Sequence, residues 1–318
     1  MIQGAGNISD SDSPIIIEDL TKSYGNFTAV NDLTISVKKN SFTGFLGPNG
    51  AGKSTTLKIL TNLIRATSGS AYLNGIDVTK NAKDALMDVG TVVETPEFYT
   101  YLTPVETMTY LGKINGMTSE SLKAKIPEIL EKMKMTEWAD KRIGTFSKGM
   151  RQRIALGQSL LTDPSVIILD EPTSGLDPRG MIEIREILKS LKTQNLTIFM
   201  SSHMLYEVSD LCDRIAMINH GKLLVHDTTD GVMNRTGARV VKIRLLNEIT
   251  PVIVKDIGEL SNVLGASVDG SAVDVRLNGG DAEQAALLRD VTAMGLNVYG
   301  ISNDNLESVY LDLIKESR

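Results

Sequence analysis

The stretch Gly47-Pro-Asn-Gly-Ala-Gly-Lys-Ser-Thr55 decides how the rest of the sequence is interpreted. It matches the pattern G-x-x-x-x-G-K-[ST], in which glycines let the backbone curl until several N–H groups face one point. An apolar, β-prone run over 41–46 precedes the loop and a helical pattern over 57–64 follows it. The positive end of that helix adds to the attraction for anions. The loop therefore predicts a binding site for the phosphates of a nucleotide.

Three side chains of the loop have separate expected roles. Lys53 should reach the β- and γ-phosphates, Ser54 should ligate Mg²⁺, and the Thr55 hydroxyl should reach the α-phosphate. The whole loop is assigned to the nucleotide site, which gives the residues Gly47, Pro48, Asn49, Gly50, Ala51, Gly52, Lys53, Ser54 and Thr55.

A second candidate site lies at the end of an apolar run. Val166-Ile-Ile-Leu-Asp-Glu-Pro172 predicts a buried strand that ends in two carboxylates, and the carboxyl edge of a sheet is where α/β proteins place ligands. Asp170 is expected to hold Mg²⁺ through water. Glu171 should point toward the γ-phosphate and orient or deprotonate the attacking water. A merely solvated strand end is the alternative.

The pattern of the remaining chain predicts two domains and a tail. Apolar runs over 165–169 and 196–200 alternate with helical patterns over 148–161 and 180–192, which predicts an α/β domain on a parallel sheet. A helical subdomain over about 98–162 is expected as an insertion. The predicted boundaries are a flexible tail at 1–13, the main domain at 14–235 and an accessory domain at 236–318.

The accessory domain has its own pattern. Apolar and polar residues alternate over 241–245 and 273–277, and amphipathic helices are expected at 281–294 and 305–315. This predicts an α+β sandwich, with a ferredoxin-like arrangement as one form. A regulatory or dimer-stabilising role is expected, and a domain that only shields apolar surface is the alternative.

Composition narrows the class of protein. The chain has 318 residues, 33 Lys plus Arg and 39 Asp plus Glu, and a formal charge of −6, so no nucleic-acid partner is expected. The single cysteine, Cys212, fits a reducing compartment. No apolar run approaches the ~18 residues that a membrane span needs. We expect a cytoplasmic protein that reaches a membrane only by docking onto another chain.

Four further motifs resemble those of one family. Phe146-Ser-Lys-Gly-Met-Arg-Gln-Arg153 resembles the signature sequence of ABC-transporter ATPases, and Ser174-Gly-Leu-Asp177 resembles their D-loop. His203, after Ser201-Ser202, is similar to their switch histidine, and Tyr24 to their adenine-stacking aromatic residue. The resemblance covers roughly 14–235 and is closest to single-cassette exporters of drugs, peptides or lipids. It implies a P-loop NTPase fold, an ABC cassette, with ATP and Mg²⁺ as cofactors.

The resemblance also implies roles and partners. Glu171, His203 and Lys53 would be catalytic, and Ser54, Asp170 and Glu94 would hold the metal. Ser147, Lys148, Gly149 and Asp177 would meet the nucleotide of a second protomer in a homodimer or heterodimer, and a separate transmembrane permease would place the protein at the inner face of the membrane. Plainer readings remain for single residues: Ser147 as a helix N-cap, Tyr24 as a core residue and His203 as a structural residue.

Two residues depart from the usual family pattern. Glu94 stands where a glutamine is usual, and Ser147-Lys-Gly-Met150 replaces the more common Ser-Gly-Gly-Gln. The expected function is that of an ATP-hydrolysing subunit of an exporter. A soluble ABC ATPase of DNA repair or translation is the alternative, but those proteins carry two cassettes or a long coiled coil. The segment from Glu94 to about Gly112, which contains the aromatic stretch Pro96–Tyr101, is expected to dock the membrane partner. Packing of Phe98, Tyr99 and Tyr101 in the helical subdomain is the alternative.

Overall fold

The computed structural model describes residues 12–233, 239–270, 272–303 and 310. The chain divides into two compact units between His226 and Asp227. Most of the predicted tail 1–13, the composition change at 234–237 and the predicted helix 305–315, apart from residue 310, lie outside the described residues.

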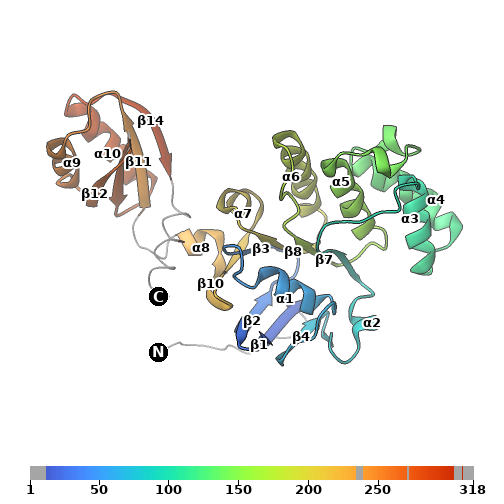
Figure 1. The fold of residues 1–318 in the computed structure, drawn as a ribbon. Helices are drawn as coiled ribbons and strands as arrows, with labels where there is room; N and C mark the ends of the chain where they lie inside the picture. The colour runs from blue at the N-terminus through green and yellow to red at the C-terminus, as the bar shows by residue number, and fades with distance from the viewer. Residues whose placement is uncertain (1–11, 234–238, 271, 304–309, 311–318) are drawn as a thin grey trace. The chain divides into compact units, whose positions relative to one another are not determined.

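A six-stranded sheet forms the centre of the first unit (Figure 1). Its order is β10-β9-β3-β8-β7-β6, and every printed pair from β9 to β6 is parallel. The strands β3, β7 and β8 are almost wholly buried, which explains their continuous apolar sequences. The predicted parallel sheet is confirmed. The bounds are β3 (Phe42–Leu46), β6 (Val89–Val92), β7 (Val166–Asp170), β8 (Thr197–Ser202), β9 (Arg214–Asn219) and β10 (Lys222–Thr228).

A second, antiparallel sheet of order β2-β1-β4-β5 was not anticipated by the sequence analysis. The side chains of its inner face share one core with helix α1 and with the central sheet, so α1 (Lys53–Leu60) lies between the two sheets. Its strands are β1 (Ile15–Tyr24), β2 (Phe27–Val37), β4 (Ser68–Leu73) and β5 (Ile76–Asp77), followed by the short helix α2 (Ala82–Ala85).

Helix α1 starts earlier and ends earlier than its apolar pattern predicts. The expected range was 57–64, but the helix begins at Lys53 because Gly52 already acts as its N-cap. It ends at Leu60, and Asn62 then takes a left-handed backbone conformation with φ of 54°. The apolar pattern did not predict the first turn, because its residues face the loop and show no apolar periodicity.

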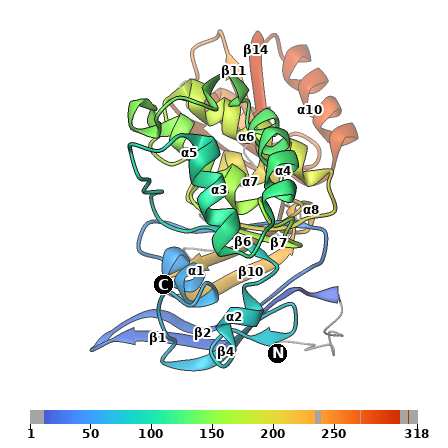
Figure 2. The same ribbon diagram turned by 90° about the vertical axis from the view of Figure 1, so that its right-hand side faces the viewer.

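Helices fill the chain between β6 and β7, as the inserted helical subdomain requires (Figure 2). A capping box fixes the first of them: Glu106 N donates to Thr103 Oγ1 at 3.2 Å, and Thr103 N donates to Glu106 Oε2 at 2.8 Å. The methionines Met108, Met133 and Met135 are buried and form core rather than a cofactor site. The helices are α3 (Pro104–Ile114), α4 (Ser119–Lys132) and α5 (Lys148–Ser159), with 3₁₀ turns at Thr136–Trp138 and Ile143–Thr145.

One further helix follows the acidic strand β7, and another follows β8. They are α6 (Pro178–Lys192) and α7 (Leu205–Leu211), and α7 packs on β3 and β8. In the part of the chain that the structure describes, no helix has the length and apolarity to cross a bilayer.

After helix α8, the second unit has the order β-α-β-β-α-β, with an antiparallel sheet β12-β13-β11-β14. This is the ferredoxin-like arrangement that the sequence suggested as one form. One sheet face packs on its helices through a core that includes Ile243, Ile257, Val275 and Leu287. The elements are α8 (Thr229–Met233), β11 (Arg239–Leu245), α9 (Pro251–Gly258), β12 (Val263–Asp269), β13 (Ala272–Leu277), α10 (Asp281–Ala293) and β14 (Val298–Asn303).

The contact between β6 and α5 gives a stability test. A Cβ atom at Gly90 would lie 2.0 Å from the Ser159 carbonyl oxygen, where no side chain fits without movement of the backbone. We expect Gly90→Ala to lower the free energy of unfolding by about 1–3 kcal/mol, the usual effect of overpacking. Urea unfolding followed by circular dichroism measures this change. The control is Gly265→Ala, whose Cβ would meet no atom within 4 Å. Equal midpoints for the two variants would contradict the packing.

Candidate functional site

The Gly-rich loop is held in place by backbone hydrogen bonds at both ends. Gly47 N donates to the Ser202 carbonyl of β8 at 3.3 Å, and Gly221 N donates to the Ala51 carbonyl at 2.9 Å. Gly52 has φ of 107°, and a Cβ there would lie 2.4 Å from the Ala29 carbonyl oxygen. Only glycine fits this position, so the curl of the loop follows directly from the sequence.

The Lys53 ammonium sits inside the curl. Its side chain is 4% exposed, and Nζ donates to the carbonyl oxygens of Gly47 at 2.8 Å and Pro48 at 3.1 Å. A buried ammonium requires partners of this kind. The loop is thus arranged around a positive charge.

Asp170 ends β7 within reach of that loop. Ser54 Oγ donates to Asp170 Oδ1 at 3.1 Å, and Ser201 Oγ donates to the same oxygen at 2.5 Å. The backbone N–H of Glu171 in turn donates to Ser201 Oγ at 3.0 Å. Ser201, at the end of β8, therefore positions both carboxylate residues.

Glu171 is held between two donors. Its Oε1 lies 3.4 Å from Lys53 Nζ, and its Oε2 lies 3.1 Å from His203 Nδ1. Burial raises the pKa of Glu171. The hydrogen bond with His203 and the charge of Lys53 together lower it by more than burial raises it, so the pKa lies below its ordinary value. His203 follows β8, the neighbour of the acidic strand, as the sequence predicted. The carboxylate is ionised at neutral pH.

Two small pockets flank these carboxylates. A pocket of about 220 Å³ borders the loop, and one of about 190 Å³ lies on the other side of Ser54 and Glu171, which line both. The first is lined by Phe27, Ala29, Asn49, Gly50, Gly52, Lys53, Ser54, Thr55 and Glu171. The second is lined by Ser54, Glu94, Thr95, Pro96, Lys148, Gln152, Asp170, Glu171 and Ser174.

Glu94 shares the second pocket with Ser54 and Asp170 but pairs with another residue. Its carboxylate forms an ion pair with Lys58 Nζ, and its side chain is 59% exposed. The backbone of Glu94 is left-handed, with φ of 72°, which is uncommon for a residue with a side chain.

The signature residues lie at helix starts. Ser147 caps α5 by accepting a hydrogen bond from Met150 N at 3.2 Å, and Asp177 caps α6 by accepting from Gly180 N at 3.3 Å. Ser147, Gly149 and Asp177 line neither small pocket. Lys148 lines the second one, and its Nζ donates to the Ser174 carbonyl at 2.9 Å.

Tyr24 ends β1, is 49% exposed and carries the Lys22 ammonium 4.8 Å from its ring centroid. The aromatic residue that lines the loop pocket is Phe27, which the sequence analysis did not single out. The plainer reading of Tyr24 as a buried core residue is wrong, and its contact with a base stays a prediction.

Sequence reasoning missed three residues near the site. Ser201 was quoted without a role, and Lys58 was not considered. Glu207 is 2% exposed and accepts hydrogen bonds from Thr173 Oγ1 and, at 2.9 Å, from Ser202 Oγ. Glu207 therefore ties the turn after Glu171 to the end of β8. A carboxylate in an amphipathic helix gives no sequence signal for such burial.

Comparisons with known proteins agree with this geometry. The profile of the family described as "ABC transporter" matches residues 30–174. The bacitracin transport ATP-binding protein BcrA of Bacillus licheniformis is 37% identical over 299 residues, which cover 93% of this chain and 95% of that protein. The linearmycin resistance ATP-binding protein LnrL of Bacillus subtilis is 33% identical over 300 residues, 93% and 96% of the two chains.

The fold agrees as well. A solved ATP-binding subunit of an ABC transporter superposes with a TM-score of 0.64 at 26% identity, covering 71% of this chain and 94% of that one. The chain belongs to the ABC transporter family, as one of its ATP-binding, ATP-hydrolysing subunits.

Proposed function

We propose that this chain is the motor of an exporter: it binds ATP with Mg²⁺ at the loop, hydrolyses it with Glu171 and works on a separate membrane subunit. One observation carries the catalytic part of the proposal. Lys53 and His203 converge on an anion, the Glu171 carboxylate, directly beside the Gly-rich loop. The same two donors are suited to the γ-phosphate of a nucleotide.

The residues present fit a magnesium ion. Ser54 and Asp170 place two hard oxygen donors 3.1 Å apart at a small pocket, and the Glu94 carboxylate, which lines the same pocket, is a third source of oxygen ligands. Within the described ranges, no group of three or more His, Cys, Asp or Glu side chains is arranged as a metal cage. This donor set suits an ion that is bound together with phosphate and water. When bound, Mg²⁺ would neutralise charge that develops on the phosphates.

Glu171 is the proposed general base. In the structure its pKa is lowered by His203 and Lys53. If His203 and Lys53 contacted the γ-phosphate instead of Glu171, they would no longer lower the pKa of its carboxylate. Glu171 would then be a stronger base when it faces the attacking water. Ser201 keeps the backbone of Glu171 in place during this exchange of partners.

Dimerisation completes the proposed site. Ser147 stands at the N-terminus of α5, a position that attracts anions, yet it lines neither pocket of its own chain. We assign Ser147, Lys148, Gly149 and Asp177 to the nucleotide of the second cassette, in a symmetric dimer with two ATP.

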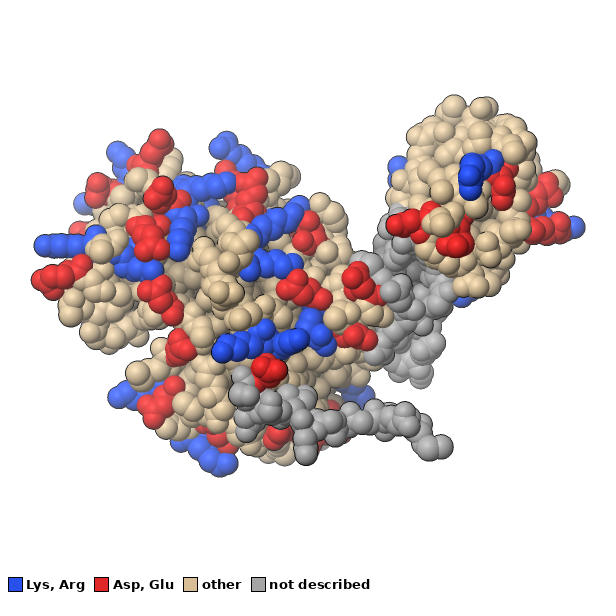
Figure 3. All heavy atoms as spheres, turned by 180° about the vertical axis from the view of Figure 1, so that it is seen from behind, with Lys and Arg blue, Asp and Glu red and all other residues tan. Residues whose placement is uncertain are grey.

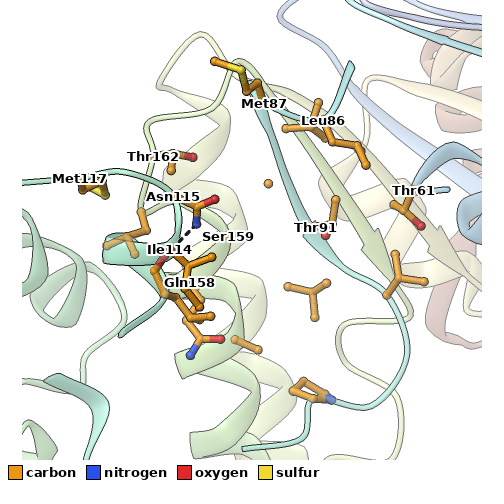
Figure 4. Close-up of a pocket in the computed structure, with 18 of the residues that line it drawn as sticks. Thr61, Leu86, Met87, Thr91, Ile114, Asn115, Met117, Gln158, Ser159 and Thr162 are labelled. Atoms are coloured by element: carbon orange, nitrogen blue, oxygen red, sulfur yellow. Dashed lines mark hydrogen bonds between the residues drawn. The ribbon is translucent and has the colours of Figure 1, made fainter. Parts of the chain in front are cut away.

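An open groove is the proposed docking surface for the membrane subunit (Figure 4). Its volume is about 1260 Å³, and exposed apolar side chains line it, Met87 at 72% and Ile114 at 64%. Glu94, Pro96 and Phe98 line the same groove, so the loop at the metal site continues into it. The exposed rings of Tyr99 and Tyr101 extend this surface, and Tyr99 contacts both Tyr101 and Tyr110.

Acidic and basic side chains are interspersed over the cassette in Figure 3. Exposed pairs such as Lys134–Glu186 contribute little each to stability. The relatives named for bacitracin and linearmycin support a peptide-type or antibiotic-type substrate for the exporter. A role in DNA repair or translation is not favoured.

The general-base assignment is tested by Glu171→Gln. This change keeps the shape and removes the base and one negative charge beside the phosphates, so we expect ATP to bind while turnover falls about 10²–10⁴-fold. Phosphate release measured at saturating ATP gives the rate. Glu186→Gln, on the exposed face of α6, serves as the control with normal turnover. Turnover of Glu171→Gln near that of the control would remove Glu171 from this role.

Lys53→Ala and Ser147→Ala separate the two halves of the nucleotide site. Loss of the charge-assisted contact should weaken ATP binding by the Lys53→Ala monomer about 10- to 150-fold. Ser147→Ala should keep monomer affinity and lose the ATP-driven dimer. Titration with a fluorescent nucleotide and light scattering measure the two properties. A similar loss of monomer affinity in both variants would disprove the assignment of Ser147 to the partner's nucleotide.

The docking groove is tested by Met87→Glu combined with Ile114→Glu. Two buried charges in an apolar contact should abolish co-purification with the membrane subunit, while basal ATPase of the free subunit stays normal. Ile182→Glu is the control, because Ile182 is 52% exposed on α6 outside the groove. If the double variant still co-purifies, the membrane subunit binds elsewhere.

A further inference from the structure

Lys58 is a charged residue beside the candidate metal ligand Glu94, and the proposed function does not involve it. It lies one helical turn after Ser54 on α1, so the two side chains share a face of the helix. Its Nζ forms the ion pair with Glu94, and its own side chain is 31% exposed.

The ammonium of Lys58 acts on the proposed metal ligands. The hydrogen bond with Glu94 raises the pKa of Lys58 most, partial burial opposes this, and the charges of Glu94 and Asp170 add to the increase. The positive charge of Lys58 thus interacts with two of the three residues assigned to Mg²⁺, Glu94 and Asp170. Ser54, the third, is on the same helix face.

The loop that carries Glu94 is held in an unusual conformation. Its backbone has φ of 72°, which costs energy for a residue with a Cβ, and the structure shows one charged contact of its side chain, that to Lys58. The residues after it, Pro96, Glu97 and Phe98, line the docking groove. The ion pair therefore joins the nucleotide helix to the loop that reaches the groove.

We propose that Lys58 is a positioning residue that competes with Mg²⁺ for the Glu94 carboxylate. Without nucleotide, Lys58 neutralises Glu94 and fixes the loop. When the metal and nucleotide bind, Glu94 leaves Lys58 for the cation, and the loop is released toward the groove. This inference rests on the proposed function, because it needs the metal–nucleotide site at Ser54 and Asp170.

The strength of the pair suits a reversible exchange. An exposed ion pair is worth at most about 1 kcal/mol, which corresponds to about fivefold in affinity at 1.36 kcal/mol per tenfold. A glutamine at position 94, as is usual in the family, carries no charge for which a lysine could compete. The competition is specific to a chain that has both Glu94 and Lys58.

The experiment measures the affinity of the full chain for Mn²⁺ in the presence of a non-hydrolysable ATP analogue, from the free Mn²⁺ signal in electron paramagnetic resonance. We expect Lys58→Met to bind Mn²⁺ about two- to fivefold more tightly than the wild type. Lys58→Arg keeps the ion pair and should bind like the wild type. Lys132→Met is the matched control, since Lys132 is 34% exposed and also pairs with a glutamate, Glu128.

A double-mutant cycle shows whether Lys58 acts through Glu94. In a Glu94→Gln background, Lys58→Met should change Mn²⁺ affinity by less than about 1.5-fold, because the competition is already gone. An equal gain in Mn²⁺ affinity in both backgrounds would mean that Lys58 acts only as a general repulsive charge, which would overturn the proposal. Unchanged or weaker Mn²⁺ binding by Lys58→Met would overturn it as well. Failure of the wild type to bind Mn²⁺ with the nucleotide would instead disprove the proposed function.

Discussion

The buried ammonium of Lys53 is the constraint on which the rest of the site depends. A charge that is almost completely removed from water must be surrounded by oxygen atoms, and here these are two carbonyls of its own loop and the carboxylate of Glu171. The loop can provide its carbonyls only because glycines allow its curl. Glu171 can reach the ammonium only because β7 and β3, the strand that leads into the loop, end at the same edge of the sheet.

A second layer of polar contacts keeps that arrangement in register. Ser201 bonds both to Asp170 and to the backbone of Glu171, and Glu207 bonds to the strand end on one side and to Thr173 on the other. These groups come from β7 and the turn after it, from β8 and from α7. The end of the acidic strand and the segment that leads to His203 are therefore positioned by one shared network, and a change in one residue is felt by its neighbours.

How much could be predicted from sequence depended on how local the signal was. The strands β3, β7 and β8 were predicted because both of their faces are buried and their sequences are continuously apolar. The antiparallel sheet was missed because its alternation is interrupted: Asp19 and Asp32 take left-handed conformations where the register of β1 against β2 shifts. The N-cap at Ser147 was available from sequence only as the plainer alternative to a nucleotide contact. The pair of Lys58 with Glu94 joins residues distant in sequence, and no pattern within either segment predicts it.

The pairing of the central sheet has a consequence for the synthesis of the chain on the ribosome. β3 lies between β8 and β9, so Phe42 pairs with Ile198 and Leu46 with Met217. The antiparallel sheet can form from residues that emerge early, because β1 pairs with β2 and β4. The strand before the Gly-rich loop must wait until nearly the whole cassette has left the exit tunnel. Non-local pairing of this kind is slow and leaves apolar edges exposed in the meantime. The nascent cassette thus passes through a long interval in which a strand that is wholly buried in the folded protein is a target for chaperones.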